Sequence, residues 1–218
     1  TATDANNDTL TYTWDQLDLG AAGDPQTPVG QAPLFRFFSP ETSATRVFPQ
    51  WQDLANNTQT IGELLPGYSR SINFRFVVRD NHINSGGVTY ADYALSVTDT
   101  AGPFRVTVPN TAETWLPNET KTVQWDVANT NTAPVGCTQV DILLSLDKGL
   151  TFPQVLAAQT ANDGLHQIVV PAVNSSIARI KVACSNNVFF DISDTDFLID
   201  GAGIAVDSDG DSIGDGVD

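Results

Sequence analysis

Five aspartates at the C-terminal end of the chain have the residue type and spacing of a cation site. They fall at positions 1, 3, 5, 9 and 12 of the stretch DSDGDSIGDGVD and are Asp207, Asp209, Asp211, Asp215 and Asp218. Calcium takes six to eight oxygen ligands, which alternate carboxylates supply, and the carbonyl of Ile213 at position 7 adds a backbone oxygen. The stretch therefore predicts a calcium loop. A solvated acidic linker is the alternative interpretation.

The glycines of this stretch indicate which calcium loop it resembles. Position 6 is Ser212, where an EF-hand has its turn-forming glycine, and the pattern D-x-D-G-D-x-x-G-D-x-x-D instead resembles a thrombospondin type 3 calcium repeat. Residues 210–214 also match G-x-S-x-G, the nucleophile motif of serine hydrolases. That motif needs a buried strand before the serine and a helix after it, whereas an aspartate run precedes it here. We interpret that match as chance.

The charge of the chain excludes several classes of partner. The 26 acidic residues, 22 of them aspartate, outweigh 10 basic ones and leave a net charge of −16. Such a chain repels nucleic acid phosphates and anionic membrane surfaces. It contains no apolar run near the roughly 18 residues of a membrane span, and no signal peptide. Because it begins at Thr1 and has no methionine, we expect a piece of a longer protein, whose other parts are its first partners.

Two cysteines, Cys137 and Cys184, complete the list of residues that could form covalent or metal bonds. In a secreted chain an isolated pair is usually a disulfide, and we expect one here. Two free buried thiols in a cytosolic protein are the alternative. Zinc is not expected, since two cysteines and two distant histidines do not form a ligand cluster.

The apolar pattern predicts an all-β protein. Runs of period-two alternation recur between turn signals, and no long stretch has a helical period. We expect two tandem immunoglobulin-like or fibronectin-like β-sandwiches at 1–100 and 103–200, followed by the acidic tail at 201–218. In the first, strands are expected at 9–14, 34–38, 45–48, 72–78 and 93–97. Its core is expected to contain Trp14, Phe74, Phe76 and Tyr93.

Two short strings resemble known β-structural motifs. The opening ATDANNDTLTYTW resembles that of bacterial cadherin-like and PKD-like sandwich modules, in some of which an acidic turn binds calcium. The corresponding weaker metal candidates here are Asp4, Asn6, Asp8 and Asp80. An Asx-rich turn without metal is the interpretation that we favour for them. Residues 145–152, SLDKGLTF, resemble an Asp-box, a hairpin turn that its serine and aspartate stabilise and that carries no chemistry.

Longer strings resemble one family. They are LFRFFSPETSATRVFP, FRVTVPNTAETW, CTQVDILLSLDKGLTFPQVLA and ARIKVACSNNVFFDISDTDFLI. Over 34–199 the chain resembles the C-terminal accessory sandwiches of secreted bacterial zinc metallopeptidases of the reprolysin-like class. The resemblance implies an exported parent chain with a protease domain elsewhere. The family's zinc motif HExxHxxGxxH has no match, and the two histidines are His82 and His166.

These features favour a non-catalytic accessory region that is secreted or at the cell surface. It would act as a calcium-stabilised spacer, an adhesion module or a module presenting a protein or polysaccharide substrate. The alternative is a carbohydrate- or polymer-binding module, which needs aromatic side chains outside the core. Trp51 and Trp115 are the candidates, because neither lies on the apolar face of a predicted strand. An enzyme would need a nucleophile with its base, or paired acids outside turns, and the sequence indicates neither.

Overall fold

The computed structural model describes residues 2–201 and is all-β, with a single short helix among those residues. The chain divides into two compact units, Thr1–Asp99 and Thr100–Asp218, and the boundary falls just after the end of the last strand of the first unit. The predicted calcium loop, from Asp207 to Asp218, lies outside the described residues. No helix of the described part is long and apolar enough to cross a membrane.

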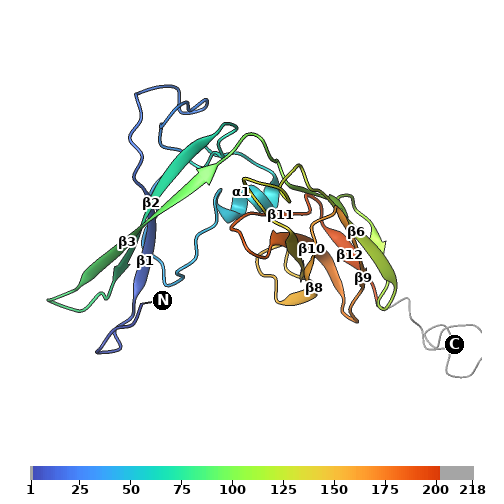
Figure 1. Ribbon diagram of the computed structural model, residues 1–218. Helices are drawn as coiled ribbons and strands as arrows, with labels where there is room; N and C mark the ends of the chain where they lie inside the picture. The colour runs from blue at the N-terminus through green and yellow to red at the C-terminus, as the bar shows by residue number, and fades with distance from the viewer. Residues whose placement is uncertain (1, 202–218) are drawn as a thin grey trace, which may run out of the picture. The chain divides into compact units, whose positions relative to one another are not determined.

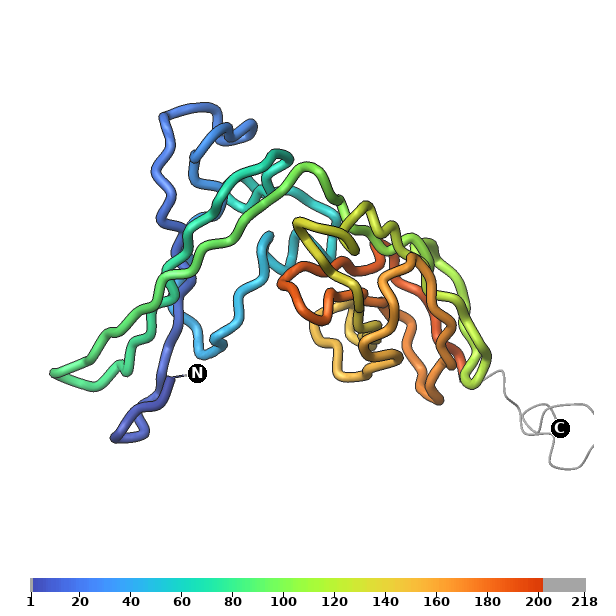
Figure 2. The backbone as a smooth tube through the Cα atoms, viewed as in Figure 1, coloured from blue at the N-terminus to red at the C-terminus, as the bar shows by residue number. Residues whose placement is uncertain are grey.

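The first unit is built on a three-stranded antiparallel sheet (Figure 1). Its strands are β1 (Thr11–Gln16), β2 (Arg70–Arg79) and β3 (Val88–Val97), with β2 in the middle. β2 and β3 pair without interruption along ten residues and form the long teal-to-green hairpin of Figure 2. Because directly opposed residues of antiparallel strands share a face, Tyr12, Trp14, Phe76 and Tyr93 belong to one face and Tyr90 to the other.

An irregular segment, residues 34–65, covers part of the aromatic face. Leu34 and Phe35 pack on Ile72 and Phe74 of the sheet, and these four residues form the buried core of the unit. The strands predicted at 34–38 and 45–48 are not formed. Isolated bridges join Tyr12 to Glu41 and Phe35 to Glu63, and the short helix α1 (Trp51–Asn56) follows.

Side-chain hydrogen bonds replace a regular ladder in this segment. The side-chain oxygen of Gln16 accepts hydrogen bonds from the backbone N–H groups of both Leu34 and Phe35, at 2.7 and 2.9 Å. The Arg46 guanidinium donates to the carbonyl of Trp14 at 2.8 Å. These partners satisfy backbone groups that a strand would otherwise have to pair, so the segment crosses the sheet without becoming part of it.

The predicted core of the first unit is only partly correct. Phe74 is buried, at 2% exposure, as expected. Trp14 and Phe76 are half-buried, and Tyr93 is 51% exposed. All four side chains lie on the predicted face, but the covering segment buries that face fully only near Ile72 and Phe74 and leaves Tyr93 on β3 exposed.

The second unit is a β-sandwich. One sheet has the order β5-β12-β10-β7-β8, with β11 also paired to β10, and the other has the order β4-β6-β9. The strands are β4 (Arg105–Val108), β5 (Thr114–Trp115), β6 (Thr120–Asp126), β7 (Gln139–Ser145), β8 (Gln154–Ala161), β9 (Leu165–Val169), β10 (Ser175–Cys184), β11 (Phe190–Ile192) and β12 (Phe197–Ile199). Inward residues of both sheets form one continuous core, which contains Trp125 as predicted.

The predicted disulfide is present in this core. Cys137 and Cys184 are bonded, and both side chains are buried. Cys184 ends β10, and Cys137 precedes β7, which pairs with β10. The bond spans 47 residues of sequence, a separation for which chain-entropy arguments give a stabilisation of about 4 kcal/mol as an upper value.

The Asp-box forms the turn after β7 and has the structural role that its resemblance implies. The hydroxyl of Ser145 accepts hydrogen bonds from the backbone N–H groups of Asp147 and Gly149, at 3.2 and 2.8 Å. The Asp147 carboxylate accepts from the N–H and the hydroxyl of Thr151, at 2.9 and 2.6 Å. Burial alone would raise the pKa of Asp147, but the hydrogen bonds that its carboxylate accepts from the Ser145 hydroxyl and from Thr151 outweigh it and lower that pKa.

Candidate functional site

The predicted weaker metal ligands near the N-terminus lie close to the β2–β3 hairpin loop. One carboxylate oxygen of Asp4 accepts from the N–H groups of Asn6 and Asp8, at 2.8 and 2.9 Å. Asp80 accepts from the N–H groups of His82 and Gly87. His82 Nδ1 lies 2.9 Å from a carboxylate oxygen of Asp8 and so connects the two turns. Among residues 2–201 there is no group of three or more His, Cys, Asp or Glu that could hold a metal.

The carboxylates of Asp4 and Asp80 therefore stabilise Asx-type turns in the described structure. Hydrogen bonds from the backbone of His82 and Gly87 are the largest cause of the lowered pKa of Asp80. Calcium binding by Asp4, Asn6, Asp8 and Asp80 is not tested by these hydrogen bonds and stays a weaker prediction.

Trp115 is not available to a ligand. It belongs to the two-residue strand β5, is 1% exposed, and packs on Phe197 with ring centroids 4.4 Å apart. Its selection as a ligand-stacking residue was wrong, because a strand this short leaves no alternating pattern in the sequence. The parallel pairing of Trp115 with Ile199 of β12 places the indole inside the core.

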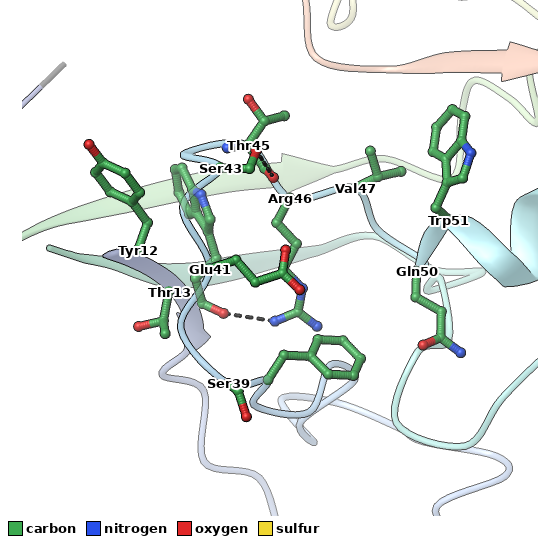
Figure 3. Close-up of a pocket in the computed structure, with 12 residues that line it drawn as sticks. Tyr12, Thr13, Ser39, Glu41, Ser43, Thr45, Arg46, Val47, Gln50 and Trp51 are labelled. Carbon is green, nitrogen blue, oxygen red and sulfur yellow. Dashed lines mark hydrogen bonds between the residues drawn. The ribbon is translucent and has the colours of Figure 1, made fainter. Parts of the chain in front are cut away.

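Trp51 lies at the start of α1 and is half-buried. It is one of the residues around a cavity of about 260 Å³ in the first unit (Figure 3). The cavity lies between β1 and the irregular segment, and its wall contains aromatic rings, hydroxyl groups and two ionisable side chains. The lining residues are Tyr12, Thr13, Trp14, Phe38, Ser39, Glu41, Ser43, Thr45, Arg46, Val47, Gln50 and Trp51.

Arg46 holds the wall of the cavity together. Its guanidinium lies over the rings of Phe38 and Phe48, at 4.5 and 4.4 Å from their centroids. It forms an ion pair with Glu63 at 2.6 Å, and the Glu63 side chain is fully buried. Burial raises the pKa of Glu63, although the charge of Arg46 opposes that shift. The guanidinium is thus bound on several sides by the protein itself.

An aromatic cluster adjoins this cavity on the sheet. We define it as Tyr12, Trp14, Phe76 and Tyr93. Tyr12 and Phe76 are stacked with centroids 5.4 Å apart, and Trp14 lies 4.7 Å from Phe76 and 5.4 Å from Tyr93. Tyr12 and Trp14 also line the cavity, so the two features form one continuous surface.

Glu41 is the acidic residue of this surface. Its backbone pairs with that of Tyr12 through two hydrogen bonds, of 2.8 and 3.1 Å, in an antiparallel bridge. Residues paired in this way point to the same face, so the Glu41 side chain shares the face of the aromatic cluster. Figure 3 shows its side chain extending among the other residues that line the cavity. Glu41 is exposed, and no hydrogen bond or ion pair of its carboxylate occurs within residues 2–201.

Sequence reasoning found these aromatic residues but assigned most of them to the core. The alternation of TLTYTW and of INFRFVV shows correctly that the aromatic side chains share a face. It carries no information about how far that face is covered. No sequence pattern indicated that Glu41 belongs to this surface, because its position beside Tyr12 depends on a bridge between segments almost thirty residues apart.

Comparison with known proteins adds little to this geometry. No protein-family model and no curated protein matches the chain. A similar solved structure is the SGBP-B protein of the Bacteroides ovatus mixed-linkage glucan utilization locus, in complex with a mixed-linkage heptasaccharide. The identity is 13%, the TM-score is 0.28, and the match covers 90% of this chain and 38% of that one. A TM-score this low carries no argument about this chain.

Proposed function

We propose that this chain is a non-catalytic region of an exported multidomain protein, and that its first unit binds a sugar chain or a similar polymer. The observation that carries the proposal is the half-exposed aromatic cluster on the sheet, continuous with a cavity lined by hydroxyl groups. Large aromatic side chains that a fold leaves half exposed, together on one face, mark a binding surface more often than scattered single ones do.

The composition of the surface suits a sugar. Pyranose rings have apolar faces that pack on aromatic rings, and their hydroxyls need polar partners around them. Tyr12, Trp14 and Tyr93 supply the aromatic surface. Ser43, Thr45 and Gln50 line the adjoining cavity and can donate and accept hydrogen bonds.

Export is supported by the disulfide. A disulfide in the core of the second unit persists in an oxidising compartment and is rare in the cytosol. The resemblance to accessory sandwiches of secreted zinc metallopeptidases adds a parent of that class to the proposal. In such a parent the first unit would hold a polymer near a protease domain, and the second unit and the aspartate-rich tail would act as a calcium-stabilised spacer.

A pair of tyrosines on β3 allows a matched test. Tyr93 is 51% exposed and lies in the aromatic cluster, and Tyr90 is 59% exposed on the opposite face of the same strand. We expect the wild-type chain to be retarded in affinity electrophoresis by at least one soluble polysaccharide. Tyr93→Ala should weaken that binding about tenfold, equivalent to about 1.4 kcal/mol, and Tyr90→Ala should leave it unchanged.

Two results would contradict the proposal. One is that no polysaccharide in a panel of neutral, acidic and amino-sugar polymers, and no glycan on an array, retains the wild-type chain. The other is that Tyr90→Ala weakens binding as much as Tyr93→Ala does, which would place the contact elsewhere. Either result would leave the spacer function as the remaining role of the first unit.

A further inference from the structure

Glu41 indicates the charge of the ligand that this surface accepts, an inference that rests on the proposed function. The cavity wall holds one cation and one anion, Arg46 and Glu41, and the two differ in whether a ligand can use them. A charged side chain that already has its partners contributes little to a ligand, whereas an unpaired one must find a new partner when water is displaced.

Arg46 is already paired. One terminal nitrogen donates to the carbonyl of Trp14 at 2.8 Å, and the other donates to the carbonyl of Arg36 at 2.9 Å and to Glu63 at 2.6 Å. Its Nε is buried without a hydrogen-bond partner, and the guanidinium lies against Phe38 and Phe48. An anionic ligand would compete with the fully buried Glu63 for this cation, and loss of that ion pair would leave the Glu63 carboxylate without its cation.

Glu41 is free to pair. Its carboxylate is exposed on the face of the aromatic cluster, beside Tyr12. No ion pair of Glu41 occurs within residues 2–201, and the nearby Arg46 is paired with Glu63 instead. Within the cavity wall Arg46 and Glu41 have opposite charges, and the negative excess is that of the whole chain, whose net charge is −16. Anionic polymers are therefore repelled by the molecule as a whole.

A protonated amine can interact both with the Glu41 carboxylate and with the aromatic cluster. An ammonium group beside a carboxylate forms a charge-assisted hydrogen bond, and beside aromatic rings it gains cation–π attraction. The hydroxyls of a neutral sugar can also donate hydrogen bonds to the Glu41 carboxylate, but those bonds lack the charge assistance of an ammonium group, and a neutral sugar has no cation–π attraction to the rings. The hydroxyls that line the cavity, on Ser39, Ser43 and Thr45, favour a hydroxyl-rich ligand over a basic peptide.

We infer that the first unit binds a polymer of amino sugars with free, protonated amines, and that Glu41 is the residue that selects it. The test compares the hexamer of β-1,4-linked glucosamine with the hexamer of N-acetylglucosamine, which differ in the charge of the amine. Titration calorimetry of the full chain at about pH 5.5, where the sugar amine is protonated and exposed carboxylates are ionised, measures both affinities. The glucosamine hexamer should bind at least about tenfold more tightly, and its affinity should fall with salt.

The variant Glu41→Gln should reduce that ratio to about one and leave the affinity for the N-acetylated hexamer unchanged. Its fold should persist, because Glu41 pairs with Tyr12 through backbone groups only. Asp92→Asn is the control, since it removes one charge from the opposite face of the same sheet and should keep the preference. Loss of preference in both variants would mean that the net charge of the chain, and not Glu41, attracts the amine.

The other outcomes separate this inference from the function on which it rests. Equal affinity for the two hexamers overturns the amino-sugar assignment and leaves sugar binding intact. A hexalysine peptide that binds as tightly as the glucosamine hexamer, and that also loses affinity in Glu41→Gln, would assign the surface to basic peptides instead. If neither hexamer binds and the polysaccharide panel also fails, the proposed function itself is wrong.

Discussion

Arg46 and Glu41 lie in one cavity wall and have opposite charges. Arg46 is paired within the protein, whereas the Glu41 side chain is exposed to solvent. The difference comes from their partners. Arg46 faces a buried carboxylate and backbone carbonyls, so it fastens the irregular segment to β1. Glu41 pairs through its backbone alone. At the scale of residues, the chemistry of this surface is therefore decided by which charges the fold has already paired.

Asp191 in the second unit shows the same dependence on environment. It accepts a hydrogen bond from the backbone N–H of Val106 at 2.7 Å. Burial, with a smaller contribution from the charge of Asp194, raises the pKa of Asp191 to about 6, against the effect of that hydrogen bond. The folded unit therefore holds this proton more strongly than the unfolded chain does.

This raised pKa predicts a pH-dependent contribution to stability. The contribution of Asp191 is fully present below its unfolded pKa of about 4 and is lost as the pH rises through about 6, because the unfolded chain then binds fewer protons than the folded one. Asp191→Asn mimics the neutral acid at every pH. It should match the wild type near pH 4 and be more stable near pH 7, by up to about 3 kcal/mol.

Urea unfolding at both pH values, followed through tryptophan fluorescence, to which Trp115 and Trp125 in the core of the second unit contribute, measures this difference. Asp163→Asn, an exposed aspartate in a turn of the same unit, is the control and should follow the wild type at both pH values. A variant whose stability relative to the wild type is the same at pH 4 and pH 7 would show that Asp191 is not shifted.

At the scale of elements, the turn after β7 depends on one buried hydroxyl. Ser145 is fully buried, and its oxygen accepts from two backbone N–H groups and donates to Asp147. Ser145→Ala would leave the buried N–H of Gly149 without a partner, at a cost of about 1–3 kcal/mol. For a unit of this size that loss lowers the melting temperature by roughly 4–8 °C per kcal/mol.

Differential scanning calorimetry tests this prediction. Ser176→Ala is the matched control, because Ser176 is exposed on β10 of the same unit and should melt with the wild type. Equal melting temperatures for the Ser145 variant and the wild type would show that the Asp-box is not needed to hold the turn.

At the scale of the whole molecule, the acidic tail is the main candidate for a metal site. The loop of five aspartates lies outside the described residues and stays a prediction. We expect it to bind calcium with a dissociation constant on the order of 10⁻⁴–10⁻³ M, because Ser212 replaces the usual glycine and Asp218 the usual glutamate. That range suits a protein outside the cell.

Calorimetric titration of the whole chain with calcium measures this affinity. The combined change Asp209→Asn with Asp211→Asn should abolish the heat, and both units should keep their melting temperatures. The pair Asp4→Asn and Asp8→Asn is the control for the N-terminal turn and should leave the heat unchanged. If millimolar calcium produces neither heat nor a change in the NMR signals of the tail, the stretch is an acidic linker.

The sequence alone was sufficient for much of the fold. Period-two alternation predicted β2 and the aromatic face of β1, because side chains of a strand point alternately to its two faces. The cysteine pair predicted the disulfide, and the residues SLDKGLTF predicted the hairpin turn with its serine and aspartate. The strands and the hairpin turn depend on interactions between residues close together in the sequence. The disulfide could be predicted because two cysteines allow only one pairing.

Other features depended on contacts between distant segments. Alternation states which side chains share a face, but only the path of residues 34–65 decides that Phe74 is covered and that Tyr93 is exposed. Trp115 gave no strand pattern, and its burial follows from pairing with β12 more than eighty residues later. Glu41 joins the aromatic cluster through a bridge to Tyr12. The candidate site is a product of tertiary structure, because burial and charge pairing are properties of neighbours that the chain order does not place together.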